Sequence, residues 1–208
     1  MAMNTFSKCR LSVPLLISMV IFSKVPIAAA AEPSNQTILQ QGVQIGSTQF
    51  PEGDTDQGGN GQSIDGIEGL SQEMLKNHLH AHLSIFYKGM QIAVPRGIGI
   101  IKPFHVVNGF VEGGKGYYWL HTHDASGIVH VESPKDQSYD LGNFFDIWGQ
   151  PLEMHNVAGF KGRLHVFVDG KIYFGEIRKI SLKQHTQIIL AIDSPGVSLA
   201  SHIFPDGL

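Results

Sequence analysis

One stretch of this chain, residues 118–134, concentrates histidines at spacings that suit metal chemistry. The metal-binding side chains in it are His121, His123, His130 and Glu132. Between the first two and the last two lies Asp124–Gly127, where Asp can hydrogen-bond its own backbone and Gly accepts a positive φ. The stretch is therefore predicted to form two short strands joined by a tight turn.

The register of this hairpin decides whether its polar side chains meet. If His123 pairs with Ile128 across the turn, His121 faces His130 on the neighbouring strand. Side chains two apart on a strand share a face, so the three imidazoles and Glu132 would project to one side. Such a set can hold a metal ion, whereas a slip of one residue would move His130 to the other face.

A second set of alternating histidines comes earlier, on the expected strand around residues 78–87. Two His-x-His sets in one domain favour a transition-metal site closed by both strands. The predicted ligands are His80, His82, His121, His123 and His130. The predicted hydrogen-bonding neighbours of the ligands are Glu132, Asp124 and His185.

Simpler interpretations stand beside these predictions. Asp124 and His185 also suit turns, Glu132 suits a plain surface carboxylate, and His82 suits a histidine at the edge of the core that is hydrogen-bonded to the backbone. The remaining histidines are predicted to be exposed, and these are His78, His105, His155, His165 and His202.

The kinds of donor atom narrow the choice of metal ion. Cys9 is the only cysteine and lies near the start of the chain, so the expected donors are imidazoles without thiolates. Imidazoles suit copper, zinc and nickel, and an added carboxylate admits iron or manganese. Copper or zinc is the predicted ion, and the sequence does not choose between them.

Residues 1–31 have the layout of a cleaved secretory signal peptide, with a basic start, a short apolar run and small residues before Glu32. The protein is therefore expected to be periplasmic or extracellular, with no membrane span in the mature chain. Loss of Lys8, Arg10 and Lys24 from 15 basic residues would leave 12 against 18 acidic ones, a balance of −6. This charge argues against a nucleic-acid partner.

Residues 32–65 are polar and rich in Gly, and we interpret them as a flexible arm through which a protein partner or a second copy could bind. Residues 66–208 are predicted to form a single β-rich domain with similar hairpins at about 82–94 and 163–175. Short helices are expected at 71–77 and 138–149. The predicted fold is mostly β, an antiparallel sandwich or small barrel.

Three motifs of this chain resemble those of a functionally uncharacterised family of exported bacterial proteins. They are His80-Ala81-His82-Leu83, residues 120–134 (LHTHDASGIVHVESP) and residues 141–149 (LGNFFDIWG). The resemblance spans about residues 64–192 and supports the domain limits, but it implies no reaction. Some relatives have a cysteine shortly before the first His-x-His, whereas residues 64–76 here have none.

Three functions remain open from the sequence. The first is an exported metal-binding protein for sequestration, delivery or structural use. The second is a metalloenzyme in which the ion activates water or O₂ and Glu132 or Asp124 moves protons. The third is a β-rich interaction module whose histidines bind no metal. The chain has no Gly-x-Ser-x-Gly, phosphate-loop or His-Glu-x-x-His motif.

Overall fold

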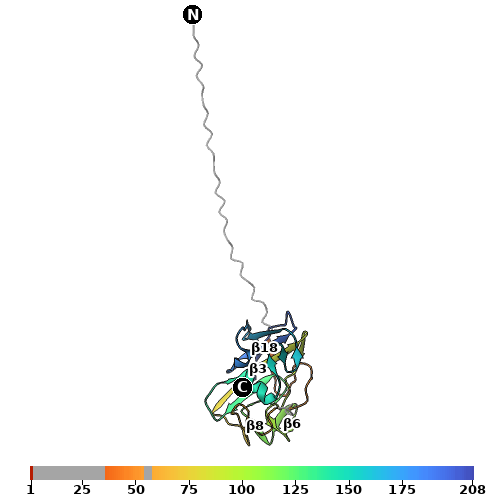
Figure 1. Cartoon of the computed structure of the whole chain (residues 1–208), viewed down its shortest axis with the longest axis vertical. Coiled ribbons are helices and arrows are strands. Elements are labelled where there is room, and N and C mark those ends of the chain that lie inside the picture. Colours follow the sequence, from red (N-terminus) through yellow and green to blue (C-terminus); the bar gives the residue numbers. More distant parts are fainter. Residues whose placement is uncertain (2–35, 54–57) are drawn as a thin grey trace. The chain divides into compact units, whose positions relative to one another are not determined.

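The computed structural model describes Met1, residues 36–53 and residues 58–208 (Figure 1). Apart from Met1, the predicted signal peptide at residues 1–31 lies outside the described residues. The described part is mostly β, with one α-helix, several antiparallel sheets and no closed barrel. This agrees with the predicted sandwich. Among the described residues, no helix is both long and apolar enough to cross a membrane.

The largest sheet carries the strands that matter for the histidines. Its order is β16-β15-β18-β3-β10-β9, and β4 pairs with β3. Its strands are β3 (Asn77–Tyr87), β4 (Met90–Ile92), β9 (Leu120–His121), β10 (Ile128–Ser133), β15 (Leu164–Val168), β16 (Lys171–Ile172) and β18 (Gln187–Ile192). All pairs in it are antiparallel except β18 with β3, which run parallel.

Both predicted hairpins are present in this sheet. Strands β3 and β4 are joined by Lys88-Gly89, with φ of 50° and 81°, and β15 and β16 by Asp169-Gly170, with φ of 50° and 72°. Two successive positive φ values give the turn whose twist matches that of the flanking strands. The predicted third strand, β18, lies between the two hairpins and joins them.

Smaller sheets surround this one. Strand β1 (Gln36–Ile38) pairs in parallel with β19 (Ser201–Ile203), and the other pairs are antiparallel. Those other strands are β2 (Gly69–Leu70), β5 (Ile100–Ile101), β6 (His105–Val107), β7 (Phe110–Gly113), β8 (Gly116–Tyr118), β11 (Tyr139–Asp140), β12 (Leu152–Glu153), β13 (Asn156–Val157), β14 (Phe160–Lys161) and β17 (Ser181–Leu182). A 3₁₀ turn, η1, spans Ile177–Lys179.

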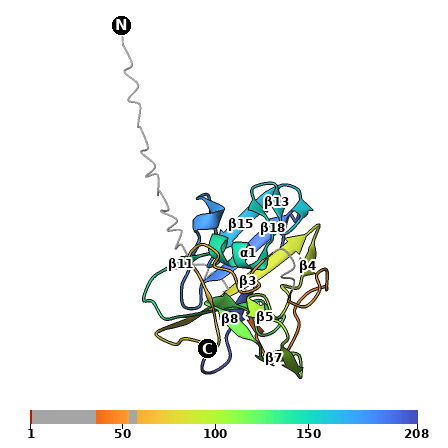
Figure 2. The same cartoon turned by 60° about the horizontal axis from the view of Figure 1, so that its bottom comes forward.

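Helix α1 (Leu141–Trp148) confirms the helix expected at 138–149. Asn143 Oδ1 accepts a hydrogen bond from the backbone N–H of Asp140 at its start, and Gly149 ends it with φ of 75°. The helix buries one apolar side, and the side chains on it include Leu141, Phe144, Phe145 and Trp148. In Figure 2, α1 lies over β3 and β18, whose inward residues share its buried core cluster.

The described part of the predicted polar arm lies along the domain. Its strand β1 pairs with β19, and Leu39 is buried. Backbone groups of Ser47 exchange hydrogen bonds with Gln91 and Ala93, and Phe50 packs edge-on against Trp148. Residues 36–53 therefore contribute to the core despite their polar composition.

The helix predicted at residues 71–77 is not formed. After β2 the chain runs through bends and a turn and enters β3 at Asn77. A segment this short gains too few internal hydrogen bonds to nucleate a helix without tertiary support. The tertiary contact that this segment does make is between the side chain of Glu73 and the imidazole of His123.

Candidate metal centre

Three adjacent strands bring the histidines together. In β10 and β9, His130 is paired with His121, which is the register predicted for the hairpin. On the other side of β10, His130 is paired with His80 and Glu132 with His78 in β3. Residues opposite each other in antiparallel strands point to the same face, with Cβ atoms about 4.5–5.5 Å apart. The backbone register therefore creates a polar row across the sheet.

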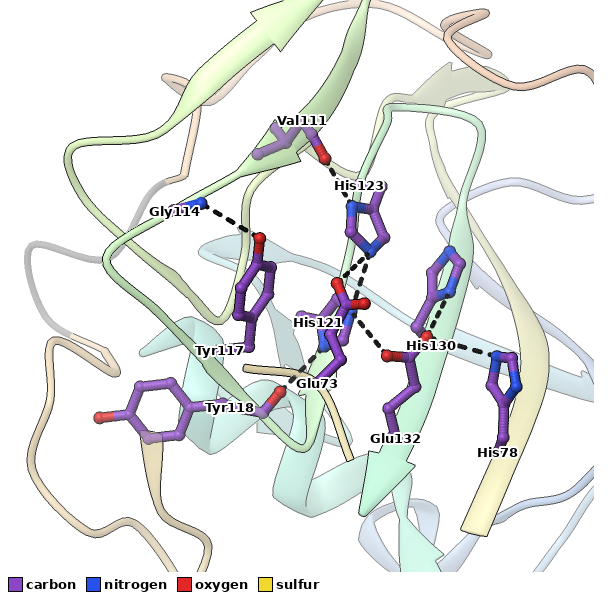
Figure 3. Close-up of polar contacts among 10 residues, drawn as sticks. All are labelled: Glu73, His78, Val111, Gly114, Tyr117, Tyr118, His121, His123, His130 and Glu132. Carbon is purple, nitrogen blue, oxygen red and sulfur yellow. Dashed lines mark hydrogen bonds and ion pairs between the residues drawn. The ribbon is translucent and has the colours of Figure 1, made fainter. Parts of the chain in front are cut away.

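His123 follows β9 by two residues, and its ring lies in close contact with that of His121. Their Nε2 atoms lie 3.1 Å apart. The Nδ1 of His121 is 2.9 Å from the carbonyl oxygen of Tyr118, and the Nδ1 of His123 is 2.6 Å from that of Val111. Each ring is thus held by the backbone on one nitrogen and faces the other ring with the second (Figure 3).

These contacts assign the tautomers. A carbonyl oxygen only accepts hydrogen bonds, so Nδ1 carries the hydrogen in both rings. In the neutral rings, both Nε2 atoms then direct a lone pair at each other across 3.1 Å. Such a contact is repulsive unless a cation, either a proton or a metal ion, lies between the two nitrogens. Two nitrogen ligands about 2.0–2.1 Å from a tetrahedral ion lie about 3.3 Å apart, close to the spacing found here.

Strand β7 and the chain around Gly99 pack against these two histidines. The backbone of Val111, in β7, both donates to and accepts from His123, and the ring of Phe110 stacks on its imidazole at 4.6 Å. Gly99, with φ of 70°, lets the chain pass so close to β9 that a Cβ there would lie 2.3 Å from the carbonyl oxygen of Leu120. The hydrogen bond to Val111 and the stacked ring of Phe110 restrict the rotation of the His123 imidazole.

His130 and Glu132 complete the group. His121, His123, His130 and Glu132 each offer one donor atom, and these atoms lie within 4.8 Å of one another. The Nδ1 of His130 is 3.4 Å from Oε1 of Glu132, and Oε2 of Glu132 is 4.0 Å from Nε2 of His121. All four residues are buried, with exposed fractions of at most 6%. A buried group of this kind can hold a metal ion.

Two further residues join the group that the sequence interpretation did not place there. Glu73 Oε1 lies 3.4 Å from Nε2 of His123, and His78 Nε2 lies 3.4 Å from Oε1 of Glu132. Their side chains are 35% and 37% exposed, so they form the solvent-facing edge of the cluster. The alternation of His78 with His80 indicated a shared face, whereas no local pattern marks Glu73.

Burial governs the charges of these groups in the metal-free chain. It lowers the pKa of His121 to about 3 and that of His130 well below its usual value, and it raises the pKa of Glu132 to about 7. Burial would also lower the pKa of His123, but its hydrogen bonds to Glu73 and Val111 raise it above the ordinary value. Of the three imidazoles, His123 is therefore the one whose protonated form its surroundings favour.

The structure places His80 beside the cluster and leaves His82 out of it. The ring of His80 lies edge-on to those of His78 and His130, each at 4.7 Å. His82 Nε2 donates to the carbonyl oxygen of Ser126 at 2.9 Å, and its ring stacks on that of His202 at 3.8 Å. His82 thus has the role of a core histidine bonded to the backbone.

The structure corrects the prediction made for His202. It was predicted to be exposed, but it is 8% exposed because β19 pairs with β1 and carries it against His82. His105, His155 and His165 are exposed, as predicted.

Asp124 and His185 lie in local structures. Asp124 accepts hydrogen bonds from the backbone and hydroxyl of Ser126 and from the backbone of Gly42, so it organises the turn after His123. The ring of His185 stacks on Phe204, and its Nε2 is 2.8 Å from the carbonyl oxygen of Leu208. Its backbone N–H donates to the carbonyl oxygen of His80, which links it to the cluster only through the main chain.

Comparisons of this chain with protein-family models, with curated proteins and with solved structures found no match.

Proposed function

We propose that this protein is an exported metal-binding protein that holds copper(II) or zinc through His121, His123, His130 and Glu132. The observation that carries the proposal is the pair of facing Nε2 atoms, 3.1 Å apart, with both Nδ1 atoms held by backbone carbonyls. The arrangement aims two lone pairs at one point, which a metal ion stabilises.

The donor set supports copper or zinc. Three imidazoles and one carboxylate match ions of intermediate softness, and copper(II) binds most tightly among the divalent first-row metals. The only cysteine, Cys9, lies in the predicted signal peptide, so the mature chain would offer no thiolate. The apolar run and the small residues that precede Glu32 support export to the periplasm or beyond.

The burial of the donors supports binding rather than catalysis. Four protein ligands close the shell of a tetrahedral ion, whereas a catalytic ion keeps one position for water or substrate. His121 is 0% exposed, and the cluster meets solvent at Glu73 and His78. Sequestration, delivery or structural support are the uses that suit such a site.

The competing state has a proton in place of the metal. In that state the imidazolium of His123 donates its Nε2–H to Glu73 or to His121, and no ion is needed. The experiment must therefore show that a metal ion binds at these nitrogens and displaces the proton.

The test is the metal content and metal uptake of mature protein purified without a histidine tag. The paired variants His121→Asn and His123→Asn keep an amide N–H near the position of Nδ1 and remove Nε2. Wild type is expected to take up copper(II) or zinc tightly, and both variants to lose this by at least tenfold. His165→Asn, at an exposed position on β15, is the matched control. A wild-type chain that takes up neither metal would overturn the proposal.

A further inference from the structure

We infer that the cluster holds two metal ions and that the carboxylate of Glu132 bridges them. The second ion is bound by His78 and His80, on the side of Glu132 opposite to His121 and His123. This inference rests on the proposed metal-binding function and extends it to a second site.

The two oxygens of Glu132 face different sets of nitrogens. Oε1 lies 3.4 Å from Nε2 of His78 and 3.4 Å from Nδ1 of His130, while Oε2 lies 4.0 Å from Nε2 of His121 (Figure 3). Carboxylates that bind one ion through each oxygen commonly join metal pairs roughly 3.5–4 Å apart. Glu132 therefore has the orientation of a bridge.

His78, His80 and Glu132 form a group with the spacing of metal ligands. Each offers a donor atom, and these atoms lie within 4.8 Å of one another. The separation of 3.4 Å between His78 Nε2 and Glu132 Oε1 is long for a hydrogen bond. It is close to the distance of about 3.3 Å between two ligands of one tetrahedral ion.

The buried ring of His80 is the independent observation that points to a ligand. His80 is 2% exposed, and among the described residues neither of its ring nitrogens has a hydrogen-bond partner. Oε2 of Glu132 and Nδ1 of His130 likewise lack a hydrogen-bond partner there. Buried polar groups are nearly always satisfied, so these unpartnered atoms around one carboxylate call for a bound cation.

The strand register makes this second group a fixed feature of the sheet. Glu132 is paired with His78, and His130 with His80, between β10 and β3. The same strand β10 is paired with β9 at His130 and His121. The central strand β10 thus offers donors to both of its neighbours on one face of the sheet.

The unpartnered nitrogens of His80 favour two ions over one. The imidazoles of His78, His80, His121, His123 and His130 bind a metal in their neutral form. A single ion near His121 and His123 would leave the nitrogens of His80 unsatisfied. A second ion binds one of these nitrogens and shares the carboxylate of Glu132.

The experiment is a titration of tag-free, EDTA-treated mature protein with copper(II), followed by calorimetry and electron paramagnetic resonance. We expect two ions per chain, with the ordinary copper(II) signal weakened and a half-field line, because a carboxylate bridge couples the two unpaired spins. His80→Asn and, separately, His78→Asn are expected to bind one ion and to show an uncoupled signal. His78 is partly exposed at the edge of the site, so its variant keeps the test valid if His80→Asn fails to fold.

The outcomes separate the two proposals. One ion per chain in wild type, lost in His121→Asn and retained in His80→Asn, would overturn the second site and leave the proposed function standing. Two ions without magnetic coupling would overturn the bridging role of Glu132. No uptake at all would overturn the proposed function itself.

Discussion

The Nε2 atoms of His121 and His123 face each other at 3.1 Å, although the Nδ1–H groups of both rings are already bound to backbone carbonyls. This relationship creates a site that can hold a cation. Four predictions follow from it and from the surrounding core.

Metal binding is expected to raise the thermal stability of the chain. A ligand at 100 times its dissociation constant stabilises the folded state by about 2.7 kcal/mol. For a chain of this size, that corresponds to a rise in Tm of roughly 5–10 °C. Differential scanning calorimetry with and without copper(II) or zinc measures this shift. It should be present in His165→Asn and absent in the double variant His121→Asn/His123→Asn.

Replacing Glu132 by Gln is expected to change metal affinity and metal-free stability in opposite directions. Burial raises the pKa of Glu132 to about 7, so its charge is unfavourable in the metal-free chain at pH 8. The neutral amide should stabilise that chain by about 1–3 kcal/mol in urea unfolding at pH 8 with EDTA. The same variant should bind copper(II) at least tenfold more weakly. Equal affinity would show that Glu132 is not a ligand.

Thr122 holds the backbone between the two facing histidines. Its hydroxyl donates to the carbonyl oxygen of Pro95 at 2.7 Å and accepts from the backbone N–H of Ile98 at 3.1 Å, with both bonds buried. Thr122→Val keeps the shape and leaves these groups unpaired, which should cost about 1–3 kcal/mol of unfolding free energy. Thr122→Ser retains the hydroxyl and should recover most of this loss. Equal losses in both variants would mean that the methyl group, which Ser lacks, matters as much as the hydrogen bonds, and wild-type stability of Thr122→Val would contradict the prediction.

The stability of the metal-free chain is expected to fall as the pH falls below 6.5, in part because of His82. Burial is the main cause that lowers the pKa of His82 to about 3, and the neighbouring imidazole of His202 lowers it further. The unfolded state, with a histidine pKa near 6.5, then binds more protons than the folded state between these values, so acid favours unfolding. The loss from His82 between pH 7 and pH 5 is about 2 kcal/mol.

The variant His82→Gln isolates this contribution. Its amide can still donate to the carbonyl oxygen of Ser126, and it does not titrate. Urea unfolding at pH 7 and pH 5, with EDTA present throughout, should show a pH dependence smaller than that of wild type by about 2 kcal/mol. The other buried histidines are common to both chains and cancel. An unchanged pH dependence would mean that His82 has the same pKa in the folded and unfolded states.

Local signals in the chain were sufficient for most individual elements. The turns at Lys88-Gly89 and Asp169-Gly170, the helix α1 and the pairing of His121 with His130 follow from residue types and spacings a few positions apart. These features depend on backbone preferences and on side-chain periodicity, which short segments carry with them.

Contacts between residues far apart in the sequence could not be predicted from such local signals. The carboxylate of Glu73 reaches His123 through a loop that was expected to be helical, and His202 reaches His82 only because β19 pairs with β1. His82 shares a strand face with His80, yet one ring points to the backbone of Ser126 and the other to the cluster. Spacing along a strand gives the face of the sheet but not the neighbours on the next strand.

From its residues alone, this chain is recognisable as a β-rich protein with paired His-x-His strands and a hairpin suited to metal ligands. Folding determines which of those histidines meet, because the register of β10 with β9 and β3 places His121, His130 and His80 in one row. Folding also buries these side chains, and burial of the donors is what turns a set of histidines into a group that can hold a metal ion.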